Sequence, residues 1–364
     1  MRVVFAPDSF KGSIAAAAAA AALAEGWASV RPDDPAVLLP MADGGEGTID
    51  AFAAAVPGTI RVPIAVTGPD AAAVDASFLR LPDGTAVVEL ASTSGIELLG
   101  DRRLPWDAHT IGFGQAIAAA LDAGATRLVL GIGSSASTDG GTGMLSALGA
   151  RFLDAAGDLV PDGARGLARI ARVDLTGLRP MPERGVLVLS DVTNPLLGPT
   201  GAAAVFGPQK GLDAADVADV DVALASFASL VEVDAATPGA GAAGGTGFAL
   251  LAWGARLAPG SVEVADLIGL AAAMAAASVV ITGEGSFDAQ SAGGKAPAQV
   301  ATIAAETGTR AGLVAGRIAP DAVTSAFAAS VSLTSLAGSS TAALADPARW
   351  LRAAGAELAL RLGA

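Results

Sequence analysis

Lysine is rare in this chain, and every lysine lies in a loop-like segment beside glycine. Lys11, Lys210 and Lys295 are the only lysines among 22 basic residues, so arginine occupies nearly every ordinary surface position. A compact ammonium group and a planar guanidinium group are not interchangeable at a crowded anion site. The use of lysine at these three positions therefore predicts contacts with an anionic ligand.

The segment from Ala6 to Ser13 combines side chains that suit a polyanionic ligand and its counter-cation. It contains the Asp8 carboxylate, the Ser9 hydroxyl and Lys11, and Ser13 is predicted to cap the alanine-rich helix that follows. The N–H groups at a helix N-terminus attract phosphate. The alternative is an ordinary turn between a strand and a helix.

A second loop carries two carboxylates among glycines. Asp43 and Glu46 flank Gly44 and Gly45, so the flexible backbone allows both carboxylates to coordinate a hard cation or to bind substrate hydroxyls. The alternative is a loop that only caps the next helix.

An acid and an amide follow a buried strand in the middle of the chain. Asp191 comes directly after the apolar stretch 186–189 and Ser190, and the only asparagine, Asn194, follows three residues later. Side chains at the end of a strand are placed as metal ligands or a general base require. The alternative for Asp191 is a helix cap.

A glycine- and hydroxyl-rich segment runs from Gly131 to Gly143. Its first six residues match the G-x-G-x-x-A form of a dinucleotide turn, and Asp154 follows about twenty residues later. The segment is longer and richer in hydroxyls than a pyrophosphate turn requires, and Asp154 begins a predicted hairpin turn. We therefore favour a substrate or phosphate cradle. No G-x-x-x-x-G-K-[ST] motif occurs in the sequence, which excludes a P-loop kinase.

Strand-like and helix-like stretches alternate at both ends of the chain and predict an α/β protein. Joined, they form a discontinuous Rossmann-like, doubly wound parallel sheet in the order 3-2-1-4-5-6, interrupted by an inserted mixed α/β domain. A hairpin turn at residues 82–84 marks the insertion, because parallel crossovers do not use such turns. The first domain is predicted at 1–67 and 270–364, the inserted domain at 68–269, and the six strands at 2–6, 36–39, 59–66, 278–281, 311–315 and 329–333.

The predicted strand order indicates where a ligand binds. The order reverses between the first and fourth strands, so the loops Pro7 to Gly12 and Gly283 to Asp288 are predicted to face each other at the carboxyl edge. We expect the active site in the cleft between the two domains.

Composition excludes several classes of protein. The absence of cysteine excludes disulfides and thiol nucleophiles, and the single histidine, His109, excludes a His-rich metal site. A net charge of −14 opposes binding to nucleic acid or to an anionic membrane surface. No secretory signal or membrane span is predicted, so we expect a cytoplasmic protein. The sequence leaves open whether the chain forms a homodimer.

In chain order, these motifs resemble the bacterial glycerate kinase family, which includes glycerate 2-kinases, along essentially the whole chain. The resemblance implies a Rossmann-like domain built from both chain ends, an inserted α/β domain, and transfer of the γ-phosphoryl group of ATP to glycerate with Mg²⁺. The 2-phosphate is the preferred product. The motifs are 6–12 (APDSFKG), 40–48 (PMADGGEGT), 89–92 (ELAS), 131–133 (GIG), 138–141 (TDGG), 191–196 (DVTNPL), 206–211 (FGPQKG), 239–245 (GAGAAGG) and 281–285 (ITGEG).

The chain departs from the family pattern in three places. The family usually has Gly, Thr and Asn where this chain has Ser134, Ser137 and Thr138, and Arg where it has Ser286. A Gly-Thr-Gly-Glu run that is common in the family is replaced by residues 111–115. The lost polar groups affect the predicted substrate more than the predicted reaction.

Phosphoryl transfer needs charge neutralisation and an aligned acceptor rather than covalent help from the protein. We predict that Asp191 orients or deprotonates the acceptor hydroxyl, and that loops 133–143 and 239–245 donate backbone N–H groups. The Mg²⁺ ligands are predicted among Asp8, Asp43, Glu46 and Glu284, while Lys11, Lys210 and Lys295 neutralise phosphate or the glycerate carboxylate. The other predicted substrate- or nucleotide-binding residues are Ser9, Phe10, Gly44, Gly45, Ser92, Gly133, Ser134, Ser135, Asp139, Gly140, Asn194, Gly283 and Gly285.

Two other functions remain open from the sequence. An NAD(P)-dependent oxidoreductase of a small hydroxy acid is favoured only by the pattern at residues 131–136. A non-enzymatic protein that binds a small ligand between two domains is the other alternative.

Overall fold

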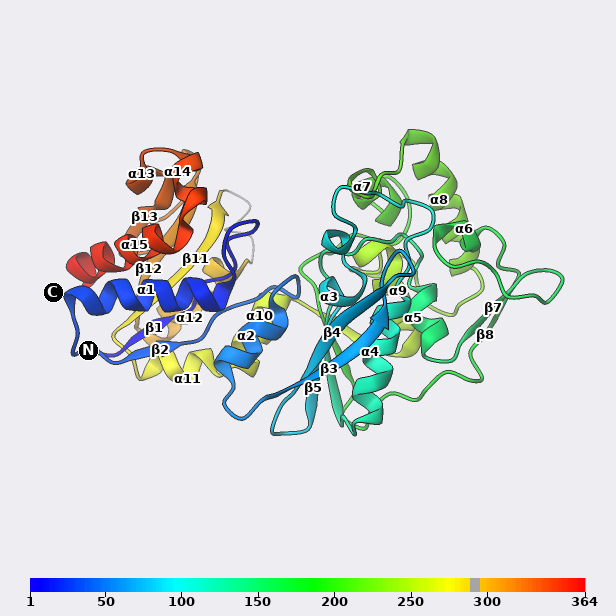
Figure 1. Cartoon of the computed structure of the whole chain (residues 1–364), viewed down its shortest axis with the longest axis horizontal. Coiled ribbons are helices and arrows are strands. Elements are labelled where there is room, and N and C mark those ends of the chain that lie inside the picture. The colour runs from blue at the N-terminus through cyan, green and yellow to red at the C-terminus, as the bar shows by residue number, and fades with distance from the viewer. Residues whose placement is uncertain (289–294, 364) are drawn as a thin grey trace. The chain divides into compact units, whose positions relative to one another are not determined.

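The computed structural model describes residues 1–288 and 295–363. Contacts within the chain divide it into two compact units, and both ends of the chain contribute to the first (Figure 1). Unit 1 comprises Met1–Asp43, Asp50–Pro57 and Ser261–Ala364, and unit 2 comprises Gly44–Ile49 and Gly58–Gly260. The chain thus has an α/β fold with one parallel sheet, one mixed sheet and a two-stranded antiparallel sheet formed by β7 (Arg151–Leu153) and β8 (Arg172–Asp174).

Unit 1 is built on a parallel sheet of five strands in the order β13-β12-β11-β1-β2. Val3 of β1 pairs with Val279 of β11 on one side and with Ala36 of β2 on the other. The side chains of Val3, Val4 and Phe5 are fully buried, as is usual for a central parallel strand. The strands are β1 (Val3–Phe5), β2 (Ala36–Leu38), β11 (Val279–Phe287), β12 (Arg310–Ile318) and β13 (Ala329–Ser332).

The third strand of the predicted order was placed wrongly. Strand β3 (Ile60–Thr67) belongs to the sheet of unit 2, where it pairs antiparallel with β4 (Ala73–Arg80). Alternate side chains of β3 are exposed, and Pro63 lacks an N–H to donate, so the strand suits a sheet edge rather than a buried parallel position. The turn at Gly68 to Ala72 that joins β3 to β4 was not predicted. The other five strands have the predicted order.

The helices of unit 1 include a closely packed pair. Helix α1 (Ala16–Val30) and helix α15 (Pro347–Leu362) lie side by side (Figure 1). A Cβ atom at Gly355 would lie 2.2 Å from the carbonyl oxygen of Leu23, so glycine is required for the close approach of the two backbones. The other helices with residues in unit 1 are α2 (Thr48–Ala55), α10 (Gly260–Leu267), α11 (Leu270–Ala275), α12 (Ala296–Thr307), α13 (Leu333–Ala337) and α14 (Ser340–Ala345).

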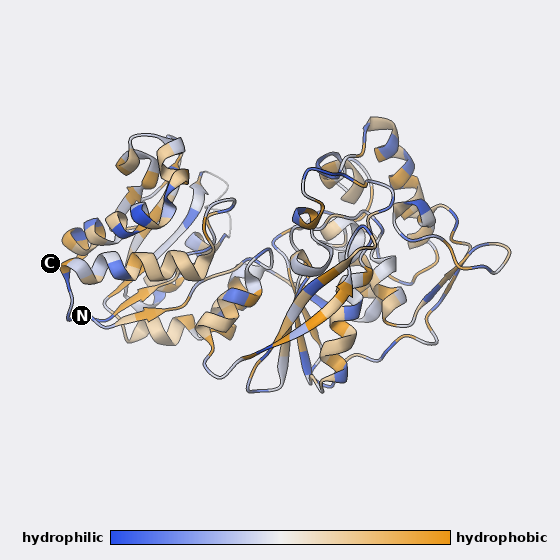
Figure 2. Cartoon of the chain, viewed as in Figure 1, coloured by the Kyte–Doolittle hydropathy of each residue, from blue (hydrophilic) through white to orange (hydrophobic). Residues whose placement is uncertain are grey.

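Unit 2 contains a mixed sheet of six strands in the order β10-β9-β6-β5-β4-β3. Strands β5, β6, β9 and β10 run parallel, and hydrophobic residues are frequent in the strands of both sheets (Figure 2). The remaining strands are β5 (Thr85–Glu89), β6 (Arg127–Gly131), β7 (Arg151–Leu153), β8 (Arg172–Asp174), β9 (Val186–Leu189) and β10 (Arg256–Ala258).

The core of unit 2 contains three packed aromatic rings, from β7, α8 and α9. Phe227 contacts Phe152 and Phe248 edge to face, with ring centroids 5.7 and 5.6 Å apart. The helices are α3 (Ala91–Ser94), η1 (Ile96–Leu99), α4 (Ile111–Asp122), α5 (Thr142–Ala147), α6 (Ala164–Leu167), α7 (Ala202–Phe206), η2 (Pro208–Lys210), α8 (Ala214–Ala228) and α9 (Ala242–Trp253). None of the described helices of the chain is long and apolar enough to cross a membrane.

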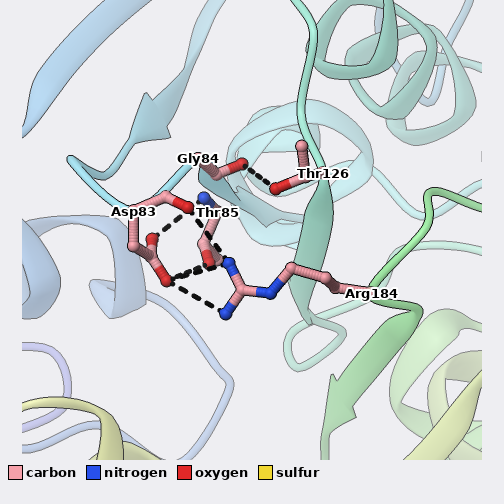
Figure 3. A network of polar contacts seen from close by, with 5 residues as sticks. All are labelled: Asp83, Gly84, Thr85, Thr126 and Arg184. Carbon is pink, nitrogen blue, oxygen red and sulfur yellow. Dashed lines mark hydrogen bonds and ion pairs between the residues drawn. The ribbon is translucent and has the colours of Figure 1, made fainter.

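The hairpin predicted at residues 82–84 is present between β4 and β5. Asp83 accepts hydrogen bonds from the N–H and the hydroxyl of Thr85, both at 3.0 Å (Figure 3). Arg184, which precedes β9, donates to the carbonyl oxygen of Asp83 at 3.0 Å, and the Thr126 hydroxyl donates to the Gly84 carbonyl. These contacts join the turn to the starts of two neighbouring strands.

Candidate active site

In unit 1, the segment after β1 meets the end of β11, as the strand order predicts. The N–H of Asp8 donates to the carbonyl oxygen of Gly283 at 2.8 Å. The predicted loop from Gly283 to Asp288 is mostly strand, because β11 stays paired with β12 as far as Phe287 and Ile318. Gly283 and Gly285 therefore lie within a strand at the carboxyl edge of the sheet.

Ser13 does not cap helix α1, contrary to the prediction from the sequence. The helix begins at Ala16, and its N-cap residue, Ala15, makes no side-chain capping bond. Phe10 and Ile14 instead form a β-bridge, and the N–H of Phe10 donates to the carbonyl oxygen of Ile14 at 2.9 Å. This bridge closes a tight turn and delays the start of the helix.

A cavity of about 330 Å³ lies in unit 1 at this edge of the sheet. Acidic and basic side chains from distant parts of the sequence line it together, and the Lys295 ammonium lies 4.0 Å from a carboxylate oxygen of Glu284. The lining also includes hydroxyl, glycine and apolar residues. The full set is Asp8, Ser9, Phe10, Lys11, Ser13, Asp43, Glu284, Gly285, Ser286, Lys295, Gly316, Leu333, Ala343 and Leu344.

The surroundings of Asp8 in the cavity disfavour the negative charge of its carboxylate. Burial, together with the nearby carboxylates of Asp43 and Glu284, raises the pKa of Asp8 to about 8. The N–H of Ser9, 2.6 Å from the Asp8 carboxylate, and the Lys11 ammonium act in the opposite direction. A bound cation would favour the ionised form of Asp8, so the electrostatics suit a cation beside these carboxylates.

The carboxylates do not form a closed metal site by themselves. Within residues 1–288 and 295–363, no three His, Cys, Asp or Glu side chains are grouped closely enough to hold a metal ion. Glu46, predicted with the other acids, is exposed and belongs to unit 2. Mg²⁺ commonly takes one or two protein carboxylates together with substrate phosphates, so an open set of acids fits this ion.

In unit 2, the glycines of two predicted motifs pack against each other. The N–H of Gly133 donates to the carbonyl oxygen of Gly44 at 2.9 Å, and a Cβ atom at Gly133 would lie 2.5 Å from the Cα of Gly45. Protein backbone therefore occupies the place that a pyrophosphate would need at a dinucleotide turn. Asp154 is engaged in its own turn and in an ion pair with Arg169 at 3.1 Å. Both observations disfavour an NAD(P) site at residues 131–136.

The Lys210 side chain is buried in unit 2. Its ammonium donates to the carbonyl oxygen of Ser137 at 2.5 Å and lies 3.5 Å from the Ser135 hydroxyl. Among the residues that the structure describes, it forms no ion pair with a carboxylate. Burial lowers the pKa of Lys210 to about 8, and Asp139 partly offsets this effect. A buried ammonium without a paired acid suits an anionic ligand.

Asp139 is fully buried and satisfied by internal donors. One oxygen accepts from the N–H and the hydroxyl of Thr110, at 2.9 and 2.8 Å, and from the N–H of Gly143 at 3.3 Å. The other accepts from the hydroxyl of Ser137 and the N–H of Gly141, both at 3.1 Å. These bonds fit a residue that positions the 137–143 loop rather than one that binds a ligand directly.

The glycine-rich segments 131–143 and 239–245 of unit 2 contact each other through residues whose backbone has a positive φ. Ala243, Gly244 and Gly245 have φ values of 53°, 67° and 92°, which interrupt α9 near its start. The N–H of Gly140, itself at φ 63°, donates to the carbonyl oxygen of Gly244 at 3.0 Å. Ser134 has φ 59°, a conformation that favours the glycine usual in the family.

Asp191 and Asn194 follow β9, as predicted. One Asp191 carboxylate oxygen accepts from the N–H of Gly260, the first residue of α10, at 2.7 Å. The Asn194 amide donates to the carbonyl oxygen of Thr200 at 2.8 Å. Asp191 is exposed, so its carboxylate can reach a ligand while it also accepts the hydrogen bond from the start of α10. Ser92 donates to the Glu89 carbonyl at 3.1 Å within its own helical turn.

Sequence reasoning missed the part of the cavity lining that comes from the last third of the chain. Gly316, Leu333, Ala343 and Leu344 belong to β12, α13 and α14 and carry no chemical motif. A weak signal existed, because the strand order brings the segments after β12 and β13 to the same edge as Asp8.

The comparisons agree with this architecture. A sequence model of the glycerate kinase family matches residues 3–362. The chain is 43% identical over 313 residues to the glycerate 2-kinase of Escherichia coli (strain K12), with 84% of this chain and 82% of that protein covered. It is 44% identical over 331 residues to the glycerate kinase of Bacillus subtilis (strain 168), with 88% and 86% covered.

A solved structure gives the same result. The protein described as glycerate kinase 2 from Salmonella typhimurium LT2 superposes with a TM-score of 0.87 and is 38% identical, with 100% of this chain and 98% of that chain covered. The chain therefore belongs to the glycerate kinase family, and it is a kinase.

Proposed function

We propose that this protein transfers the γ-phosphoryl group of ATP to glycerate with Mg²⁺. The cavity of unit 1 carries the proposal, because three carboxylates and two lysines line it at the carboxyl edge of a parallel sheet. Phosphoryl transfer requires this combination of cation ligands and phosphate-neutralising groups. The names of the E. coli and B. subtilis relatives support glycerate as the acceptor.

The proposed Mg²⁺ ligands are one or two of the cavity carboxylates Asp8, Asp43 and Glu284, with substrate phosphates completing the coordination. Bound Mg²⁺ would neutralise the charge of the phosphates during transfer. Lys11 and Lys295 line the same cavity and would contact phosphate oxygens directly. The raised pKa of Asp8 supports this role, since the apo site favours its neutral form and a cation would reverse that preference.

Unit 2 is proposed to supply the groups that bind and activate glycerate. Asp191 would orient the acceptor hydroxyl or accept its proton, and Lys210 would neutralise the glycerate carboxylate. Asp139 would hold the 137–143 loop in place beside Lys210. We propose that both units act in one reaction, with the 2-hydroxyl as the acceptor because a relative is named glycerate 2-kinase.

Mg-ATP is expected to raise the melting temperature, whereas NAD(P) is not. A ligand at a hundred times its Kd stabilises the native state by about 2.7 kcal/mol. For domains of this size each kcal/mol raises the melting temperature by about 2 to 4 °C, so a rise of several degrees is expected. A shift with NAD(P) and none with Mg-ATP would support the oxidoreductase alternative. A shift with glycerate but with neither nucleotide would indicate a non-enzymatic binding protein.

A further inference from the structure

The cavity of unit 1 has two chemically different ends. Asp8, Lys11 and Glu284 provide charge at the end between β1 and β11. The other end is made by Leu333 of α13 and by Ala343 and Leu344 of α14, none of which carries a polar side-chain atom. Leu333 and Ala343 are buried, whereas Leu344 is 60% exposed.

The strand order sets the distance between these ends. Starting from β11, the sheet continues to β12 and then to β13, and α13 follows β13 directly. Neighbouring strands lie about 4.8 Å apart, so the two spacings from β11 to β13 cover roughly 10 Å. A ligand that contacts both ends must therefore be elongated, with charge at one end and an apolar group at the other. Glycerate is small and polar throughout, so it does not meet this requirement.

The apolar wall is held in a fixed position. The Thr334 hydroxyl donates to the carbonyl oxygen of Gly316 at 2.8 Å, which joins α13 to β12. Ser339 caps α14 by accepting from the N–H of Ala342 at 3.1 Å. The indole N–H of Trp350 donates to the carbonyl oxygen of the same Ala342 at 3.0 Å. The wall is thus preformed, and a ligand group can pack on it without first ordering it.

Gly316 of β12 packs closely against the backbone of β11. A Cβ atom there would lie 2.3 Å from the carbonyl oxygen of Gly285, so no side chain can be placed at this point without moving the backbone. Gly285 and Gly316 sit on the paired strands β11 and β12, and both line the cavity. The floor between the charged end and the apolar wall is therefore bare backbone.

Exposed leucines are common and need no explanation when they are scattered. Leu360 of α15 is such a residue, since it is 70% exposed and does not line the cavity. Leu344 differs because it continues the surface formed by the buried Leu333 and Ala343 inside a cavity that also holds charged groups. An apolar group of a ligand would cover Leu344 there.

We infer that the nucleobase of a nucleoside triphosphate packs against Leu333, Ala343 and Leu344, and that the triphosphate lies at the charged end beside Lys11 and Lys295. The inference rests on the proposed function, to which it adds the position and orientation of the nucleotide. The flat, weakly polar base suits the apolar wall, and the anionic phosphates suit the lysines and a bound cation.

The variant Leu344→Gln tests this assignment, because it removes the apolar contact without changing the charge. Calorimetry should show at least a fivefold loss of ATP affinity, and affinity for inorganic tripolyphosphate should stay within twofold of wild type. The matched variant Leu360→Gln should change neither value. Both leucines are largely exposed, so both variants are expected to fold.

Three outcomes would overturn the inference. Leu344→Gln could leave ATP affinity within twofold of wild type, or it could weaken ATP and tripolyphosphate equally, and either result removes the base from this wall while leaving the kinase reaction intact. Wild-type protein that binds neither ATP nor tripolyphosphate overturns the proposed function together with the inference. Because the wild type is measured first, the two failures are distinguished.

Discussion

Asp191→Asn is expected to lower kcat by two to four orders of magnitude while leaving the melting temperature nearly unchanged. A positioned general base contributes a factor of about 10² to 10⁴, and the amide cannot accept the proton of the glycerate hydroxyl. The amide oxygen can still accept the hydrogen bond that the Gly260 N–H donates to Asp191 at 2.7 Å. The measurement is kcat at saturating ATP and glycerate, together with thermal unfolding.

Asp213→Asn provides a matched control for this variant. Asp213 also accepts backbone hydrogen bonds at a helix start, from the N–H groups of Ala215 and Asp216 at 2.8 and 2.9 Å. It lies in no predicted motif, so kcat should remain that of the wild type. If Asp191→Asn retains kcat within about threefold, Asp191 is a helix cap and has no part in the chemistry.

Lys210→Met is expected to change how stability depends on pH. Burial lowers the pKa of Lys210 to about 8 in the folded protein, from 10.5 for a solvated lysine. The unfolded chain therefore binds more protons between pH 8 and 10.5, and the contribution of Lys210 to stability rises with pH through this range. It is fully present above about pH 10.5 and is lost as the pH falls through about 8.

The expected difference is large. At about 1.4 kcal/mol per pKa unit, the free energy of unfolding of wild type relative to Lys210→Met should increase by as much as about 3 kcal/mol across the range. The chain has no tyrosine and no cysteine, so few side chains other than the three lysines titrate there. Urea unfolding of both proteins at several pH values gives the difference directly.

Lys11→Met controls for the loss of one lysine from an exposed position. Urea unfolding of Lys11→Met at the same pH values shows how much of the effect comes from the loss of any lysine. The contrary result is a difference in the free energy of unfolding between wild type and Lys210→Met that does not change with pH. That result would mean that the Lys210 ammonium is well solvated or paired, and it would remove the reason for assigning an anionic ligand to Lys210.

The strands of unit 1 could be predicted because their sequences satisfy a simple rule. Short apolar segments followed by loops and helices form parallel strands, and the right-handed crossover rule then orders them. Strand β3 followed the same local pattern, but its exposed alternate residues and Pro63 suit the edge of an antiparallel pair. Only the partner strand decides between these positions, and single-sequence periodicity does not identify the partner.

The charged part of the candidate site could be predicted because its residues lie where strands end. Asp8, Lys11 and Glu284 were assigned to one place from the strand order, and they line one cavity. The apolar wall was missed because an apolar helix residue looks the same in sequence whether it faces a core or a ligand. Asp139 was predicted to bind a ligand, yet its five internal hydrogen bonds fit a positioning role, and spacing alone does not reveal such bonds.

The product formed from glycerate and ATP tests the proposed reaction most directly. We predict that purified protein with Mg²⁺ releases one ADP for each phosphoglycerate formed. The ³¹P signal of the product should be a doublet, because the phosphorus of a 2-phosphate couples to a single carbon-bound proton. A triplet would place the phosphate on the terminal carbon and contradict the choice of hydroxyl. Folded protein that forms no ADP with glycerate, yet reduces NAD(P) with a hydroxy acid, would contradict the reaction itself.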